Sequence, residues 1–131
     1  YFITIVDDCS RGTWVYLLIH KSEAFTYISK FHNLVYNQFG KKIKILRSDN
    51  ALEFDDQYCQ QFFDEKGIIH QTSIIANRPQ QNGTVERKHR HLLEISRALR
   101  FQAGLPQSYR GDCVTAAAHI INKLPSLVIK N

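Results

Sequence analysis

Hydrophobic residues form two short runs at the start of the chain, and they then recur at helical spacing. Tyr1–Val6 and Thr13–Ile19 are rich in aromatic and β-branched residues, and a short polar turn separates them. This pattern predicts a β-hairpin. From residue 22 to residue 39 apolar residues recur every three or four positions, which predicts a helix with Ser22 as its N-cap and Gly40 as its end.

Two shorter apolar runs follow, Ile43–Ser48 and Ile68–Ser73, and both predict strands. A helix is expected between them, because Asp55 or Asp56 provides an N-cap and Gly67 provides an end. Alternation of strands with helices is typical of α/β folds.

Two more helices are predicted in the last third of the chain. Apolar residues recur at helical spacing across Val85–Leu99, and Gly104 ends that helix. A last helix is expected to begin at Gln107 or Ser108 and to end at Pro125. The whole order of elements predicts an α/β fold in which helices flank a mixed sheet.

Composition narrows the classes of protein. With 131 residues, of which 44% are hydrophobic, the chain can bury the core of one globular domain, expected over residues 1–131. The sequence contains no apolar run of the roughly 18–20 residues that a membrane span needs, so we expect no membrane partner. The odd, widely spaced set of Cys9, Cys59 and Cys113 argues against a disulfide framework.

Positive charge is concentrated in the C-terminal half. Residues 1–77 hold eight basic and nine acidic residues, whereas residues 78–100 hold six basic and two acidic ones. That distribution favours a polyanionic partner such as nucleic acid. A solvated helix surface is the alternative, and charge alone does not decide between them.

Two carboxylates are candidates for catalysis. Asp49 is expected where a strand ends, and Glu86 near the start of a helix that also carries Arg87, Lys88 and Arg90. Each acid alone is more often a solvated surface group. Together they suit phosphoryl transfer to DNA, which uses two Mg²⁺ ions about 3.5–4 Å apart held by a few carboxylates.

Four segments carry a family resemblance. Residues 46–54 (LRSDNALEF) and residues 78–88 (RPQQNGTVERK) resemble the second and third catalytic motifs of copia-type LTR-retrotransposon integrases. Residues 3–11 (ITIVDDCSR) and residues 14–16 (WVY) resemble the hairpin near the start of the same catalytic core. The resemblance covers essentially the whole chain, is closest to plant elements, and implies a piece of a Gag-Pol polyprotein.

The resemblance implies an RNase H-like fold with a five-stranded mixed sheet flanked by helices, and a site of two Asp and one Glu. Asp49 matches the second acid and Glu86 the third. It further implies a two-metal site with Mg²⁺ or Mn²⁺, no small-molecule cofactor, and the joining of element DNA ends to target DNA by a homo-oligomer. Assembly would occur in cytoplasmic virus-like particles and integration in the nucleus. The residues expected to contact DNA are Arg78, Gln81, Asn82, Arg87, Lys88 and Arg90.

The first acid of the set is not expected in this chain. The implied fold has three strands before its first long helix, whereas the sequence offers two, so the first strand and its Asp should lie upstream of Tyr1. Asp7 and Asp8 are instead expected to end their strand and bond to the following turn. This fragment alone should then bind metal weakly and perform no chemistry.

Departures from the family pattern keep an alternative open. Leu52 stands where a small residue is usual and Arg110 where Trp is common, so a decayed, non-catalytic remnant that binds DNA or a partner is the second hypothesis. RNase H activity, the third, is disfavoured because its acids differ. His89 and His91 are expected to be surface residues that touch DNA or solvent. Core positions are expected at Trp14, Phe31, Phe62 and Phe63.

Overall fold

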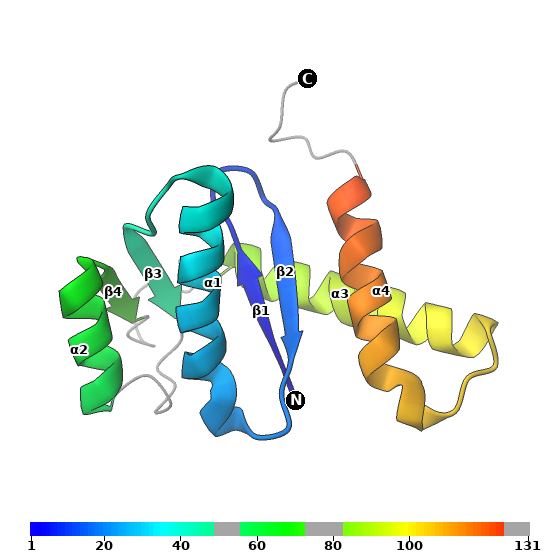
Figure 1. The fold of residues 1–131 in the computed structure, drawn as a ribbon. Helices are drawn as coiled ribbons and strands as arrows, with labels where there is room; N and C mark the ends of the chain where they lie inside the picture. Colours follow the sequence, from blue (N-terminus) through cyan, green and yellow to red (C-terminus); the bar gives the residue numbers. More distant parts are fainter. Residues whose placement is uncertain (49–55, 73–82, 125–131) are drawn as a thin grey trace. The chain divides into compact units, whose positions relative to one another are not determined.

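The computed structural model describes residues 1–48, 56–72 and 83–124, and they divide into two compact units (Figure 1). The first, the hairpin–helix unit, comprises Tyr1–Leu17 and Gly83–Asn131. The second, the parallel-strand unit, comprises Leu18–Asn82. The expected single domain over residues 1–131 stays a prediction.

The hairpin–helix unit begins with the predicted β-hairpin. Strand β1 (Phe2–Val6) pairs antiparallel with β2 (Thr13–Leu17), with Phe2 opposite Leu17 and Val6 opposite Thr13. The turn is closed by main-chain hydrogen bonds from Asp7 N to Gly12 O at 2.9 Å and from Arg11 N to Asp7 O at 2.8 Å. Arg11 adopts the left-handed conformation, with φ of 63°, that this tight turn requires.

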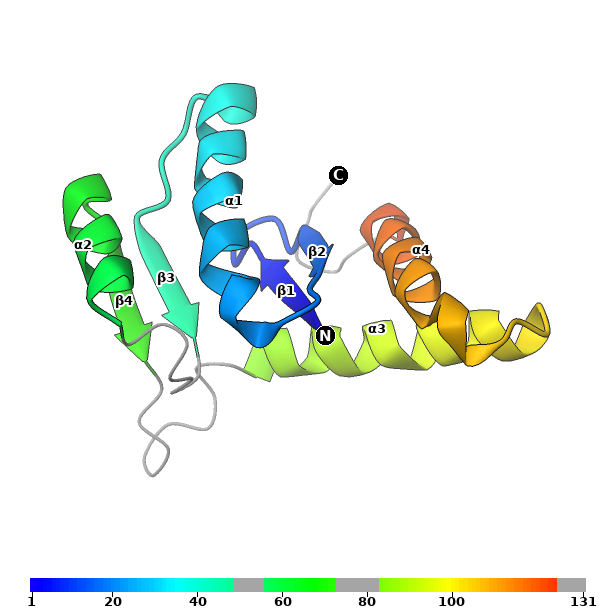
Figure 2. The ribbon, with the colours of Figure 1, turned by 60° about the horizontal axis from the view of Figure 1, so that its bottom comes forward.

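Two helices cover one face of this hairpin. Helix α3 (Gly83–Gln102) is followed by a 3-10 turn, η3 (Gln107–Tyr109), and then by α4 (Arg110–Lys123), and the two α-helices pack together (Figure 2). Phe2 and Val15, one from each strand, pack against them. The buried side chains at the centre are those of Leu92, Val114, Ala117, Ala118 and Ile121.

A side chain near the end of α4 fastens this helix to the hairpin. Asn122 Oδ1 accepts a hydrogen bond from Thr13 N at 2.8 Å, and Asn122 Nδ2 donates one to Thr13 O at 2.7 Å. The amide thus satisfies both main-chain groups of Thr13, which is only 2% exposed. This contact joins residues 109 positions apart and fixes the hairpin on α4.

The parallel-strand unit begins with a 3-10 turn, η1 (Lys21–Glu23), that leads into α1 (Ala24–Phe39). The predicted cap at Ser22 is wrong, because the chain is already helical there. Glu23 instead accepts hydrogen bonds from Ile19 N at 2.8 Å and His20 N at 3.0 Å, and these bonds lower the pKa of its carboxyl group. The predicted end is confirmed, since Gly40 is left-handed with φ of 61°.

The rest of this unit is a strand–helix–strand motif. Strand β3 (Ile45–Ser48) pairs in parallel with β4 (Ile69–Thr72), and α2 (Gln57–Lys66) connects them. Asp56 caps α2 by accepting hydrogen bonds from Tyr58 N at 2.6 Å and from Cys59 N at 3.1 Å. It is one of the two residues predicted as the N-cap. Within residues 1–48, 56–72 and 83–124 the strands form one antiparallel and one parallel pair, and a mixed sheet contains both kinds of pairing.

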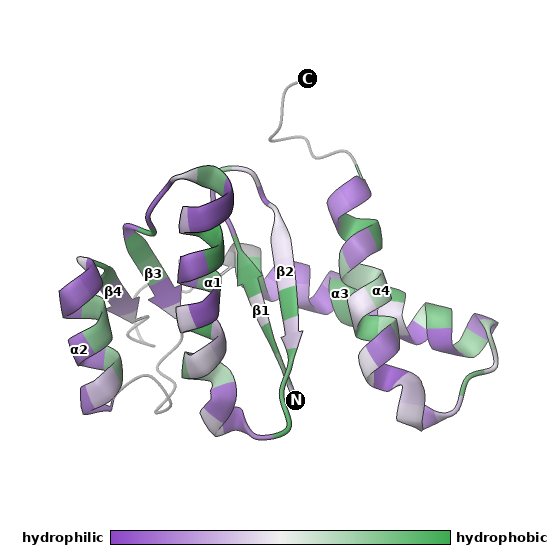
Figure 3. Cartoon of the chain, in the orientation of Figure 1, coloured by the Kyte–Doolittle hydropathy of each residue, from purple (hydrophilic) through white to green (hydrophobic). Residues whose placement is uncertain are grey.

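Aromatic rings hold the helices of the parallel-strand unit together. Phe62 of α2 meets Phe25 and His32 of α1 edge to face, with ring centroids 5.4 and 5.8 Å apart. Hydrophobic residues recur along one side of α1 (Figure 3). The predicted core residues Phe31 and Phe63 are 7% and 2% exposed. None of the helices in the described ranges is both long and apolar enough to span a membrane.

Candidate functional site

Asp49 follows directly after β3 and lies outside the described residues, as do Arg78, Gln81 and Asn82. The described residues include strand β3, which precedes Asp49, and they include Glu86. Strand β3 belongs to the parallel-strand unit and Glu86 to the hairpin–helix unit.

The end of β3 is tied to the neighbouring strand. Ser48 Oγ and His70 Nε2 share a hydrogen bond of 2.7 Å, and both side chains are half-buried. The His70 ring also packs on the buried Phe63 of α2, with centroids 4.9 Å apart. The residue that precedes Asp49 is thus linked to β4 and, through β4, to α2. The residue types alone do not reveal this contact, so it could not be predicted from the sequence.

The other face of the same strand pair is exposed. Arg47 Nε donates to Gln71 Oε1 at 3.0 Å, and these two residues are opposite each other in the register. Ile45 and Ile69, also opposite each other, are 46% and 59% exposed. The Ser48–His70 contact therefore lies on the covered face and the Arg47–Gln71 contact on the open one.

Glu86 lies in the first turn of α3 and is exposed. The helix N-terminus offers free N–H groups and a field that favours negative charge. Arg87 and Arg90 are exposed on the same helix, and Lys88 is half-buried. Among the described residues, the structure records no ion pair for Glu86, Arg87 or Arg90. These side chains are therefore open to a ligand or to solvent.

The exposed face of α3 continues beyond the predicted contact residues. Arg87, Arg90 and Arg97 are spaced by three and seven positions, which places them along one side of a helix. Glu94 interrupts this series. Near the end of the helix, Arg100 lies over the Phe101 ring at 4.9 Å. The helix thus presents a mainly basic stripe.

His89 does not face solvent as the sequence analysis expected. It is half-buried, and its ring stacks on Phe2 of β1 with centroids 5.0 Å apart and an interplanar angle of 16°. Its Nδ1 also lies 3.4 Å from Thr4 Oγ1. The prediction holds for His91, which is exposed. The overlooked signal was spacing, because His89 precedes the buried Leu92 by three positions and so lies on the core side of the helix.

The two aspartates after β1 bond to the turn, as predicted. Asp7 Oδ2 accepts from Ser10 N at 3.0 Å and from Ser10 Oγ at 2.6 Å. Asp8 forms an ion pair with Arg11 at 3.1 Å. Both carboxylates therefore have local structural partners.

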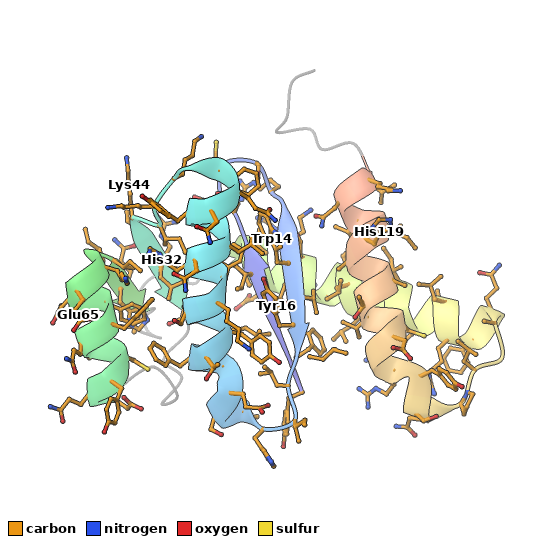
Figure 4. All side chains as sticks on the ribbon, viewed as in Figure 1. Trp14, Tyr16, His32, Lys44, Glu65 and His119 are labelled. Atoms are coloured by element: carbon orange, nitrogen blue, oxygen red, sulfur yellow. The ribbon has the colours of Figure 1, made fainter. Side chains whose placement is uncertain are left out.

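The parallel-strand unit also contains a buried histidine. His32 is 5% exposed, and within the described part of the chain its Nδ1 has no hydrogen-bond partner. It lies on the side of α1 that faces α2 (Figure 4). Burial lowers the pKa of this imidazole, and the charges of Lys66 and Lys42 lower it further. No group of three or more His, Cys, Asp or Glu placed to hold a metal occurs within residues 1–48, 56–72 and 83–124.

Cys9, Cys59 and Cys113 all lie in the described ranges, and none of them forms a disulfide bond there. Cys9 is exposed, whereas Cys59 and Cys113 are buried. Burial raises the pKa of the Cys59 thiol, and the nearby charge of Asp56 raises it further. A thiol held in its neutral form is a poor nucleophile, which suits a packing role for Cys59.

Sequence comparison relates the chain to known proteins. The profile of the integrase core domain matches residues 1–78. Over 127 residues, 97% of this chain, the sequence is 39% identical to the retrovirus-related Pol polyprotein from transposon TNT 1-94 of Nicotiana tabacum. Over 130 residues, 99% of this chain, it is 35% identical to the retrovirus-related Pol polyprotein from transposon RE1 of Arabidopsis thaliana. The chain spans 10% and 9% of these relatives.

A solved structure shares the fold. A component of the simian T-cell lymphotropic virus intasome, determined by cryo-electron microscopy in complex with PP2A regulatory subunit B56 gamma, superposes with a TM-score of 0.74. The match covers 96% of this chain and 43% of that one, at 22% sequence identity. Likeness at this identity concerns the fold alone, and it confirms the predicted RNase H-like α/β class.

Proposed function

Because the chain belongs to the integrase core domain family, we propose that it is part of the catalytic core of a retrotransposon integrase, released from a longer polyprotein. Such an enzyme processes the 3′ ends of element DNA and joins them to target DNA. The observation that carries the proposal is the identity of 39% and 35% to Pol polyproteins of two plant transposons across nearly the whole chain. The exposed Glu86 at the start of a basic helix supports it.

Asp49 and Glu86 would hold Mg²⁺ or Mn²⁺ together with an Asp from upstream. Carboxylate oxygens are the ligands these hard cations prefer, and Glu86 is exposed with no ion-pair partner in the described part of the chain. When bound, two such ions activate the attacking hydroxyl group and stabilise the leaving oxygen. The upstream position of the first acid is supported by Asp7, whose carboxylate is already bonded to the turn.

Arg87, Lys88 and Arg90 would bind phosphates of DNA along α3, together with Arg78, Gln81 and Asn82, which precede α3 in the sequence. The field of the basic stripe would draw DNA toward Glu86. Arg87→Ala should weaken DNA binding and lower the slope of log affinity against log salt by about 1, whereas Arg110→Ala, an exposed control on α4, should not. The remaining partners would be element ends, target DNA and further integrase copies, assembled in cytoplasmic virus-like particles and active in the nucleus.

The direct test is strand transfer by a polypeptide extended upstream, where we expect an Asp roughly 10–20 residues before Tyr1. This polypeptide should join element-end oligonucleotides to a target plasmid with Mn²⁺, and Asp49→Asn or Glu86→Gln should abolish joining. Glu94→Gln, an exposed acid two turns further along α3, is the matched control and should remain active. Joining that survives Glu86→Gln would refute its role, and DNA binding without joining would favour the non-catalytic alternative.

A further inference from the structure

His89 follows Glu86 by three residues and connects α3 to β1. Its ring stacks on Phe2 at 5.0 Å, and its Nδ1 lies within hydrogen-bond distance of Thr4 Oγ1 at 3.4 Å. The partners are 85 and 87 positions away in sequence, so the contact joins the start of α3 to the start of the chain. His89 is half-buried, whereas Glu86 is exposed.

In the first turns of α3, the side chains of Val85, Lys88 and His89 are half-buried. Of the side chains described between Gly83 and His91 none is fully buried, and the buried cluster begins at Leu92. Helix ends fray unless side chains hold them. The His89 contact therefore fastens the part of α3 that carries Glu86.

The same contact sets the rotation of the helix about its axis. Each residue turns an α-helix by about 100° and advances it by about 1.5 Å, so Glu86 projects about 60° from His89 and about 4.5 Å nearer the N-terminus. A helix that rolls or frays at His89 moves the Glu86 carboxylate with it. Metal ligands tolerate such displacement poorly, because they must be held within about 0.5 Å of the productive geometry.

We propose that His89 is a positioning residue: by stacking on Phe2 and bonding to Thr4, it holds the first turns of α3 and directs Glu86 toward its metal. This inference rests on the proposed function for the role of Glu86. The substitution His89→Phe separates the two contacts, because a Phe ring keeps the stack on Phe2 and loses the hydrogen bond to Thr4. His91, exposed on the same helix, is the matched control.

Amide hydrogen exchange tests the structural half of the proposal. In the folded chain the amides of residues 87–89 are bonded to carbonyls of residues 83–85. His89→Ala should speed their exchange by roughly 2- to 12-fold, the size of one aromatic pair's contribution. His89→Phe should restore most of the protection, and His91→Ala should change nothing. Phe2→Leu removes the same stack by changing the residue on β1. Exchange at residues 87–89 can therefore be measured in Phe2→Leu if His89→Ala fails to fold.

The affinity for Mn²⁺ tests whether His89 positions Glu86. It is measured from the paramagnetic broadening of α3 amide signals in the folded fraction. His89→Ala should weaken Mn²⁺ binding toward the level of Glu86→Gln, His89→Phe should largely rescue it, and His91→Ala should match the parent. A merely structural histidine would lower the melting temperature and leave the Mn²⁺ affinity of the folded fraction unchanged.

The two failures are distinguishable. If Glu86→Gln leaves Mn²⁺ binding unchanged, the proposed role of Glu86 fails, and the positioning role fails with it. If Glu86→Gln weakens binding but His89→Ala does not, the proposed function stands and the positioning role is overturned. Unchanged exchange at residues 87–89 in both His89→Ala and Phe2→Leu would likewise overturn it.

Discussion

The two units hold their helices and strands together by different means. In the hairpin–helix unit, residues distant in sequence hold the helices to the hairpin. His89 of α3, the helix that carries Glu86, stacks on Phe2, and Asn122 of α4 bonds to Thr13. In the parallel-strand unit, β3 precedes Asp49 in the sequence. A hydrogen bond between Ser48 and His70, which are only 22 positions apart, holds β3 to β4. Glu86 therefore lies on a helix held by long-range docking, whereas β3, the strand that precedes Asp49 in the sequence, belongs to a local strand–helix–strand motif.

The largest expected effects come from the two cores. The side chains of Leu92 and Phe63 are 0% and 2% exposed. Leu92→Ala and Phe63→Ala each leave a cavity in the core and should lower the free energy of unfolding by about 2–5 kcal/mol. Trp14 fluorescence follows the hairpin–helix unit, and circular dichroism follows all helices. A single domain over residues 1–131 predicts that both variants shift both signals together. If Phe63→Ala shifts the circular dichroism transition but leaves the Trp14 transition unchanged, the two units fold separately.

The Asn122 bridge should rank next. Asn122→Ala removes two hydrogen bonds to the buried Thr13 main chain, each of which contributes about 1 kcal/mol. We expect a loss of about 1–3 kcal/mol in denaturant unfolding, because one donor and one acceptor are left unsatisfied. Asn33→Ala, an exposed position on α1, is the control and should stay within about 0.5 kcal/mol. Equal effects of the two substitutions would contradict the bridge.

These long-range contacts mark the limit of what the sequence could predict. Hydrophobic spacing and caps located the strands and α-helices that the structure describes, because these signals act within a few residues, as Gly40 and Asp56 illustrate. The pairing of Thr13 with Asn122 left no local signal. His89 was misassigned because its neighbours Lys88 and Arg90 suggested a polar face, although its spacing from Leu92 placed it on the core side.

The local contact at the end of β3 should have a smaller effect. A double-mutant cycle of Ser48→Ala with His70→Phe, which keeps a ring on Phe63, should give a coupling of about 0.5–1.5 kcal/mol. The exposed Arg47–Gln71 pair of the same two strands is the control, with an expected coupling below about 0.5 kcal/mol. A stronger coupling for the exposed pair would reverse the expected order.

The smallest effect is a pH dependence confined to the parallel-strand unit. The folded state lowers the pKa of His32, so the unfolded chain binds its proton first as pH falls. Stability should be fully present above about pH 6.5, the unfolded value, and be lost progressively below it. His32→Leu should flatten this acid limb, whereas His119→Leu, exposed on α4 (Figure 4), should leave it unchanged. If His32→Leu loses stability below about pH 6.5 as the parent does, a group other than His32 is responsible for the loss.

The central claim is the proposal that Asp49 and Glu86 are ligands of one metal site. The most direct measurement is Mn²⁺ affinity in a double-mutant cycle of Asp49→Asn and Glu86→Gln, with Glu94→Gln as the control. Ligands of a shared site act together, so the second substitution should cost much less affinity once the first is present. Fully additive losses, or no loss from either substitution, would contradict the claim.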